Sequence, residues 1–86
     1  MSYNVIPTPD FKKLFKRLIK KYPSLKSDLD ELIEVLSENP DTGTALGNGV
    51  YKIRMAISSK GKGKSAGARV ITFIVTEDKE VYLVYI

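Results

Sequence analysis

Residues 50–75 read VYKIRMAISSKGKGKSAGARVITFIV, which is two strand-like runs separated by a loop rich in glycine and lysine. In the first run, the cations Lys52 and Arg54 alternate with apolar residues. Successive side chains of a strand point to opposite faces, so we expect Lys52 and Arg54 to share one face of a sheet. The second run, residues 68–75, carries another cation near its start, Arg69, and continues with β-branched and aromatic residues that favour strands.

Positive charge is concentrated in this part of the chain. Between residues 42 and 76 there are six Lys or Arg and no Asp or Glu, and the net charge of the whole protein is +4. An excess of positive charge favours polyanionic partners. Three cations on paired strands beside a basic loop therefore predict a phosphate-binding surface. The alternative is a set of ordinary solvated charges that keep the protein soluble.

This combination of cations suits RNA cleavage without a metal, in which the 2′-hydroxyl of the RNA attacks the adjacent phosphate. The protein then has to stabilise charge at phosphorus and to move protons. Arginine offers an always-charged planar fork for phosphate oxygens, and a lysine crowded by other cations gives up its proton more readily. We therefore assign Lys52, flanked by Arg54 and Arg69, as a candidate general base or electrostatic catalyst.

The loop at residues 58–67 reads SSKGKGKSAG, and its GKS triplet at 63–65 is like the end of a nucleotide-binding P-loop. That motif requires a glycine where Ser58 stands and a helix after the loop, where a strand is expected instead. We therefore reject nucleotide binding and interpret the loop as a contact to an RNA backbone. The lysines that we expect to make this contact are Lys60, Lys62 and Lys64.

The composition limits the chemistry that is possible. A length of 86 residues predicts one domain, residues 1–86. The chain contains no Cys and no His, which excludes disulfides, zinc sites built on these residues, and Ser/His or Cys/His nucleophile pairs. We expect neither a metal nor a cofactor. The apolar runs are too short to cross a membrane and no signal peptide is recognised, so we expect a cytoplasmic protein.

The N-terminal half predicts one strand followed by two helices. Residues 3–7, YNVIP, suit a short strand. Thr8 is a candidate N-cap before a proline, and apolar residues then recur every three or four positions as far as Tyr22. Ser24 is the candidate cap of the second helix, which ends at residues 39–40, Asn-Pro. The short connection implies an antiparallel helical hairpin.

The polar faces of the two predicted helices carry opposite charge. We interpret them as solvated faces that attract each other across the hairpin, and a second nucleic-acid contact by the first helix is the alternative. The first helix carries Lys12, Lys13, Lys16, Arg17, Lys20 and Lys21. The second helix carries Asp28, Asp30, Glu31, Glu34 and Glu38.

The C-terminal half predicts a loop at 41–49 and then strands at 50–57, 68–75 and 81–86, paired as an antiparallel meander. The order is βααβββ, an α+β fold in which an antiparallel sheet packs against the helical hairpin. Alternation in the last strand predicts that one face carries Val81, Leu83 and Tyr85 and that the other carries Tyr82, Val84 and Ile86.

The last two predicted strands are apolar on both faces, whereas two helices can cover only one face of a sheet. We therefore expect an uncovered apolar patch around Phe73. Such a patch predicts that the chain binds a partner segment, as a helix or as an added strand, or that it self-associates as a homo-oligomer.

Several parts of the sequence resemble the RelE/HigB/ParE toxins of bacterial toxin–antitoxin modules. They are GVYKIR at 49–54, the glycine–lysine loop, ARVI at 68–71 and the closing VYLVYI. YKIR followed by GKGKSAGARVIT is most similar to the HigB-like branch. The resemblance implies a RelE-like fold and a small cytoplasmic mRNA endoribonuclease that depends on the ribosome and inhibits translation. It also implies silencing by an antitoxin encoded beside it.

When the family's site residues are carried over by position, the resemblance implies that Lys52 and Arg54 match its basic active-site residues. It also implies that Arg69 matches the arginine at the start of the next strand. It implies that the loop lysines contact ribosomal or messenger RNA. Members of the family continue past the last strand into a segment with further active-site residues, whereas this sequence ends at Ile86. We therefore expect that segment to be absent and the activity to be attenuated. The alternative is a protein of this fold without nuclease activity, either a gyrase inhibitor or an inactive remnant that binds antitoxin.

Overall fold

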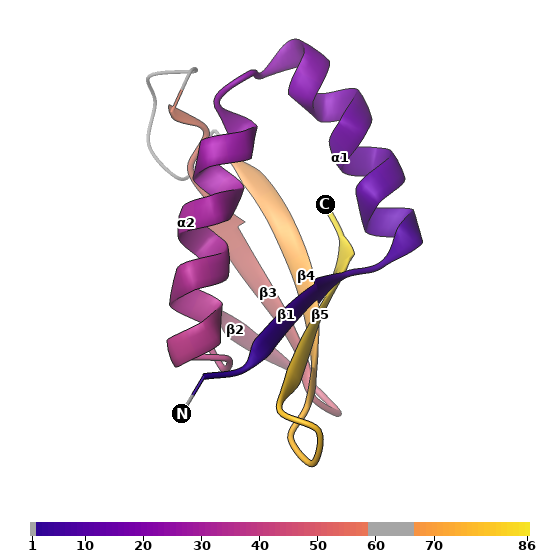
Figure 1. The fold of residues 1–86 in the computed structure, drawn as a ribbon, viewed down its shortest axis with the longest axis vertical. Helices are drawn as coiled ribbons and strands as arrows, with labels where there is room; N and C mark the ends of the chain where they lie inside the picture. Colours follow the sequence, from indigo (N-terminus) through magenta and orange to yellow (C-terminus); the bar gives the residue numbers. More distant parts are fainter. Residues whose placement is uncertain (1, 59–66) are drawn as a thin grey trace.

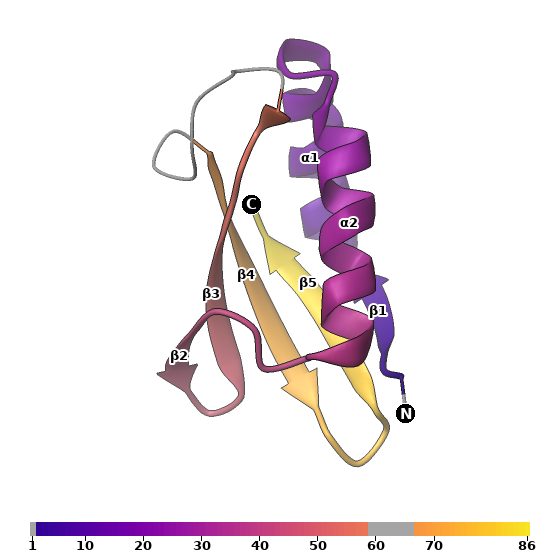
Figure 2. The ribbon, with the colours of Figure 1, turned by 90° about the vertical axis from the view of Figure 1, so that its left-hand side faces the viewer.

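The structure is a computed structural model that describes residues 2–58 and 67–86. Its elements, in chain order, are β1 (Asn4–Pro7), α1 (Pro9–Lys21), α2 (Leu25–Glu38), β2 (Thr44–Gly47), β3 (Val50–Met55), β4 (Ala68–Val75) and β5 (Glu80–Tyr85). These strands form one sheet in the order β1-β5-β4-β3-β2, and both helices lie against the same face of it (Figures 1 and 2). The predicted α+β fold is confirmed, with one strand more than the sequence indicates.

Helix α1 begins at the predicted position because Thr8 caps it. The Thr8 hydroxyl oxygen accepts a hydrogen bond from the Phe11 N–H at 3.3 Å, which satisfies one of the unpaired donors of the first turn. The same hydroxyl donates to the carbonyl oxygen of Leu83 at 2.8 Å. The start of α1 is therefore tied to β5, and Phe11 is fully buried in the core just after this contact.

Helix α2 supplies most of the helical contribution to the core. The buried apolar residues of this helix are Leu25, Leu29, Leu32 and Leu36. Asp28, which the sequence places on the solvated face, is 7% exposed, so that prediction was wrong. Residues three and four apart share a face of a helix, and Asp28 lies between Leu25 and Leu32 at this spacing.

The sheet is mixed, whereas the sequence predicts an antiparallel one. Strand β4 pairs antiparallel with both β3 and β5, but β1 runs parallel to β5, from Asn4 beside Glu80 to Pro7 beside Leu83. The antiparallel prediction is sound for strands joined by short turns. Strands β1 and β5 lie at opposite ends of the chain, so no turn between them determines their relative direction.

Strand β2 lies in a stretch that the sequence predicts to be a loop. All of its side chains are exposed, so it lacks the alternation of buried residues by which a strand is recognised. Gly47 at the end of β2 and Asn48 and Gly49 in the turn that follows have φ values of 100°, 54° and 81°. Glycine and asparagine adopt this left-handed region most readily, and the turn directs the chain back into β3.

A bulge in β5 changes which side chains of the last strand face the core. Thr72 pairs with Leu83, but the preceding Ile71 pairs with Tyr85, so β5 has one extra residue here. Leu83 is buried and Ile86 packs against the core, whereas Val84 and Tyr85 are exposed. The predicted alternation was therefore wrong for Tyr85 and Ile86.

No helix in the described part of the chain covers the second face of the sheet (Figure 2). Phe73 on this open face is 38% exposed, and Ile71 and Val75 beside it on β4 are half-buried. The predicted apolar surface around Phe73 is therefore present. Self-association through this surface stays a prediction.

Thr72 is fully buried on β4, and its hydroxyl oxygen has no hydrogen-bond partner among the described residues. A buried polar group without a partner costs about 1–3 kcal/mol. The Thr72→Val variant is expected to raise the free energy of unfolding in urea by about 1 kcal/mol, because a methyl group replaces the hydroxyl. The exposed Thr44→Val control should change it by less than about 0.5 kcal/mol. A less stable Thr72→Val protein would show that the Thr72 hydroxyl makes a stabilising hydrogen bond.

Candidate functional site

The register between β3 and β4 brings the three predicted site cations together. Arg54 pairs directly with Arg69, and Lys52, two positions earlier on β3, pairs with Ile71. Directly opposed Cβ atoms lie about 4.5–5.5 Å apart, and two residues along a strand span about 7 Å. We call Lys52, Arg54 and Arg69 the cation patch.

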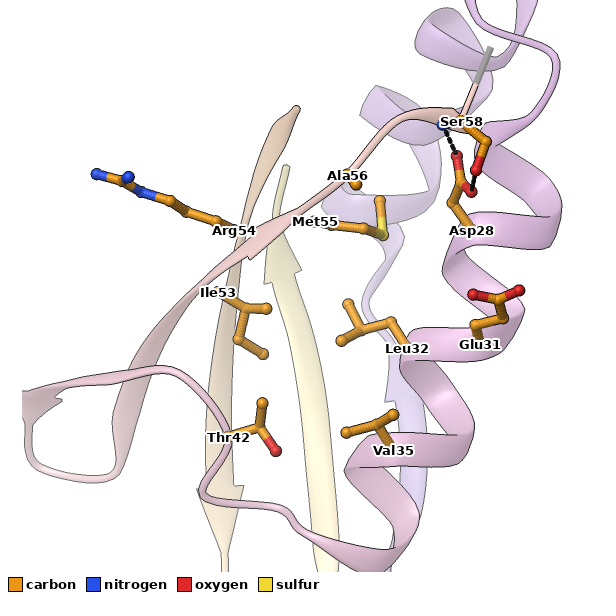
Figure 3. Close-up of a pocket in the computed structure, with 10 residues that line it drawn as sticks. All are labelled: Asp28, Glu31, Leu32, Val35, Thr42, Ile53, Arg54, Met55, Ala56 and Ser58. Atoms are coloured by element: carbon orange, nitrogen blue, oxygen red, sulfur yellow. Dashed lines mark hydrogen bonds between the residues drawn. The ribbon is translucent and has the colours of Figure 1, made fainter. Parts of the chain in front are cut away.

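The cation patch lies on the open face of the sheet. Ile53 and Met55, which alternate with the cations along β3, are buried on the other face. Figure 3 shows both of them pointing toward α2, whereas Arg54 points away from it. Arg54 and Arg69 are exposed and Lys52 is half-buried, so all three can be reached from the same side.

The strand residues around the cation patch are uncharged. Lys52 lies between Thr44 of β2 and Ile71 of β4, and the next pair on the same face is Arg54 with Arg69. Like charges at directly opposed positions repel each other, and an anion bound between them would relieve this repulsion. Two arginine forks and one ammonium group are groups that bind phosphate in proteins, so the arrangement fits the chemistry of the predicted phosphate-binding surface.

Tyr85 lies across the sheet from Lys52 and beside α1. It pairs with Ile71, which in turn pairs with Lys52, so its backbone lies two strand spacings, about 10 Å, from that of Lys52. The tyrosine is 56% exposed. It lines a surface hollow of about 310 Å³ together with Asp10, Lys13, Leu14 and Arg17 of α1. The sequence assigns no role to Tyr85 because the bulge that exposes it leaves no recognisable pattern.

The other tyrosine of β5 is engaged elsewhere. The Tyr82 hydroxyl donates a hydrogen bond to the Glu80 carboxylate at 2.7 Å. This bond, followed by burial and the negative charges of Glu80 and Asp78, raises the pKa of Tyr82 above its ordinary value. We therefore leave Tyr82 out of the candidate site.

A groove of about 350 Å³ lies between α2 and β3 on the helical side of the sheet (Figure 3). Its lining residues are Asp28, Glu31, Leu32, Val35, Thr42, Ile53, Arg54, Met55, Ala56 and Ser58. Arg54 is the one member of this lining that also belongs to the cation patch. The groove therefore borders the strand that carries the candidate site.

Asp28 occupies one end of this groove and holds the chain that follows β3. Its carboxylate accepts hydrogen bonds from the Ser58 hydroxyl at 2.5 Å, the Ser58 N–H at 2.9 Å and the Ser24 hydroxyl at 3.0 Å. Burial acts to raise the pKa of Asp28, but the bonds from Ser58 and Ser24 outweigh it and leave the pKa below its ordinary value of 3.8. Asp28 is therefore a charged, hydrogen-bonded group, which its place among the acidic residues of α2 did not indicate.

The loop lysines Lys60, Lys62 and Lys64 lie outside the described residues, and their predicted RNA contact stays a prediction. Among residues 2–58 and 67–86, no three acidic side chains are grouped closely enough to hold a metal ion. Within the same ranges, no helix has both the length and the apolar character needed to cross a membrane.

Comparison with known families decides the broader identity. The family model of the RelE toxin of the RelE/RelB toxin–antitoxin system matches residues 11–86. The chain belongs to the RelE toxin family. It is therefore a toxin of a toxin–antitoxin system, with an antitoxin as its partner, and the match extends from α1 to the last strand and includes the whole cation patch. Searches among curated proteins and among solved structures found no match.

The direct opposition of Arg54 and Arg69 makes a prediction about stability. Like charges in this geometry destabilise a sheet by about 0.2–1 kcal/mol. The Arg69→Gln variant is therefore expected to keep or to raise the free energy of unfolding in urea, by up to about 1 kcal/mol at low salt. Added salt should reduce any gain because it screens the repulsion. The matched control is Lys16→Gln on α1, and a clear loss of stability in Arg69→Gln alone would identify Arg69 as a structural residue.

Proposed function

We propose that this toxin is an endoribonuclease that cuts messenger RNA on the ribosome, without a metal ion, and thereby inhibits translation. The observation that carries the proposal is the pairing of Arg54 with Arg69 beside Lys52 on the open face of the sheet. This face is accessible to a large partner, since both helices lie on the other side (Figure 2). The closer relation to the HigB-like branch belongs to the same proposal.

The chemistry assigned to the cation patch is an in-line attack within the RNA. The 2′-oxygen forms a bond to phosphorus while the bond from phosphorus to the 5′-oxygen breaks. Lys52 accepts the proton of the 2′-hydroxyl, and the leaving 5′-oxygen takes up a proton from solvent. Arg54 and Arg69 donate hydrogen bonds to the phosphate oxygens and stabilise the charge that develops there. The products are a 2′,3′-cyclic phosphate and a 5′-hydroxyl.

Tyr85 is proposed to position the RNA beside the cation patch. Single-stranded RNA is commonly bound by stacking of its exposed bases on aromatic side chains, combined with cations along its backbone. The exposed Tyr85 supplies the aromatic face, and Lys13 and Arg17 of α1 lie around the same hollow. The RNA would then pass from the cation patch across β4 and β5 to Tyr85.

Ribosome-dependent cleavage of a defined message by the purified toxin tests the proposal. Alanine at Lys52, Arg54 or Arg69 is expected to reduce the cleavage rate at least about 100-fold, because each residue acts on the reacting phosphate. Tyr85→Phe should remain active and Tyr85→Ala should not, since stacking requires the ring and not the hydroxyl. The matched control is Lys26→Ala, an exposed cation of α2, and far-ultraviolet circular dichroism checks that every variant is folded.

A wild-type chain that binds its antitoxin yet cuts no message would contradict the proposal. That outcome would favour the alternative of a RelE-family protein that acts by binding alone. Cleavage that survives all three alanine substitutions would place the active site elsewhere on the molecule.

The lysines of the 58–67 stretch are expected to act through charge alone. Replacing Lys60, Lys62 and Lys64 by Gln should weaken RNA or ribosome binding gradually and should lower the slope of log K against log salt by about one unit per lost phosphate contact. Binding is measured by fluorescence anisotropy over a series of salt concentrations. An unchanged slope in the triple variant would show that these lysines do not contact phosphates.

A further inference from the structure

Asp28 is unusual among the acidic residues of α2. All of these residues are described, and Asp30, Glu31, Glu34 and Glu38 are exposed, whereas Asp28 is buried. Removing a carboxylate from water is costly unless hydrogen bonds or an opposite charge compensate. Hydrogen bonds from Ser58 and Ser24 provide that compensation.

Two of the three bonds to Asp28 connect parts of the chain that are far apart. Both donors of Ser58, its N–H and its hydroxyl, reach the carboxylate from a position 30 residues further along the sequence. The Ser24 hydroxyl, by contrast, is a local donor four residues before Asp28. The carboxylate therefore fixes Ser58 in both position and orientation (Figure 3). Its bond to Ser24 belongs to the start of α2.

Among the described residues, the end of β3 has few hydrogen-bonded strand partners, and its other anchors are the buried side chains of Met55 and Ile57. Strand β2 accompanies β3 only as far as Lys52, which pairs with Thr44, and the last pair with β4 is Met55 with Ala68. The Ile74 N–H donates a hydrogen bond to the Gly49 carbonyl oxygen, so Gly49 and Ile74 belong to a hydrogen-bonded pair of positions. Hydrogen-bonded and non-hydrogen-bonded pairs alternate along antiparallel strands, so the pair of Arg54 with Arg69 is a non-hydrogen-bonded one. The backbone N–H and C=O of Arg54 therefore point away from β4. Strand β4 therefore lies on one side of Arg54. On the other side, the pairing with β2 has already ended at Lys52.

We propose that Asp28 is a positioning residue of this toxin: by holding Ser58, it fixes the end of β3 and with it the Arg54 side chain in the cation patch. The inference rests on the proposed function, because it assigns Asp28 a role in the same RNA chemistry. A carboxylate suits this role better than an amide does. It accepts bonds at both oxygens, whereas the NH₂ group of an asparagine would face a donor of Ser58 or Ser24.

A purely structural role for Asp28 predicts something different. If Asp28 only stabilises the start of α2, the loss of its bond to Ser24 should matter as much for activity as the loss of its bond to Ser58. If Asp28 positions Arg54, only the bonds to Ser58 should matter for activity. Ser24→Ala and Ser58→Ala remove the same chemical group from the same carboxylate, so each serves as the matched control of the other.

The experiment measures single-turnover, ribosome-dependent cleavage at a temperature at which each variant is folded. Asp28→Asn is expected to slow cleavage by about tenfold or more, because a displacement of about 1 Å in a reacting group can cost about 100-fold. Ser58→Ala, which keeps the main-chain bond, should slow it by a smaller factor, and Ser58→Thr should restore the rate. The double variant with Asp28→Asn and Ser58→Ala should be no slower than Asp28→Asn alone, since the two changes disrupt the same interaction. Ser24→Ala should cleave like the wild type, even if it melts earlier.

Each of the remaining outcomes contradicts the inference. A folded Asp28→Asn toxin that cleaves at the wild-type rate would overturn it. A Ser24→Ala variant as slow as Ser58→Ala would reduce Asp28 to a structural residue. If Asp28→Asn does not fold, the comparison of Ser58→Ala with Ser24→Ala still decides the matter.

A second readout separates this inference from the proposed function. If the wild-type toxin cuts no message, the proposed function fails, and the same variants are titrated with inorganic phosphate while the side-chain N–H signals of Arg54 and Arg69 are followed by NMR. A response that is altered in Asp28→Asn and Ser58→Ala but kept in Ser24→Ala supports a positioning role for Asp28. An unaltered response of Arg54 in Asp28→Asn overturns it.

Discussion

The position of the cation patch in this toxin depends on the burial of Ile53 and Met55 between the sheet and α2. Side chains of a strand alternate strictly, so burying these two residues places Lys52 and Arg54 on the opposite face. A slip of one residue would bring charges into an apolar core, and the register of β3 is therefore strongly specified. The burial of Val70 on β4 places Arg69 on the open face in the same way. The apolar core thus determines the geometry of the cation patch.

The patch itself works against the stability of the sheet, because Arg54 and Arg69 repel each other across the pair of strands. Helix α2 offsets this cost by burying its leucines on the other face. The two faces of β3 therefore have different tasks, one apolar and stabilising, the other charged and available to a polyanion. Asp28 connects these tasks because it belongs to α2 yet holds the chain that follows β3.

Much of the fold can be predicted from the sequence because its signals are local. Thr8 marks the start of α1, and the β-branched run at 68–75 coincides with β4. The two-residue period also assigns Lys52 and Arg54 to one face correctly. The features of the structure that the sequence did not predict arise mainly from contacts between distant segments. The parallel pairing of β1, the bulge that exposes Tyr85 and the bonds from Ser58 to Asp28 each depend on the assembled fold, and strand β2 has no buried side chain to reveal it.

In the proposed mechanism, the cation patch promotes attack by the RNA's own 2′-hydroxyl. The most direct measurement uses two messages that differ at a single atom, with a 2′-deoxynucleotide replacing the ribonucleotide on the 5′ side of the cleaved bond. We expect the toxin to cut the unmodified message on the ribosome, in the presence of a metal chelator, and to leave a 2′,3′-cyclic phosphate. We expect the deoxy-substituted message to stay intact at that bond. Equal cleavage of both messages would rule out attack by the 2′-hydroxyl, since the attacking oxygen would then come from elsewhere.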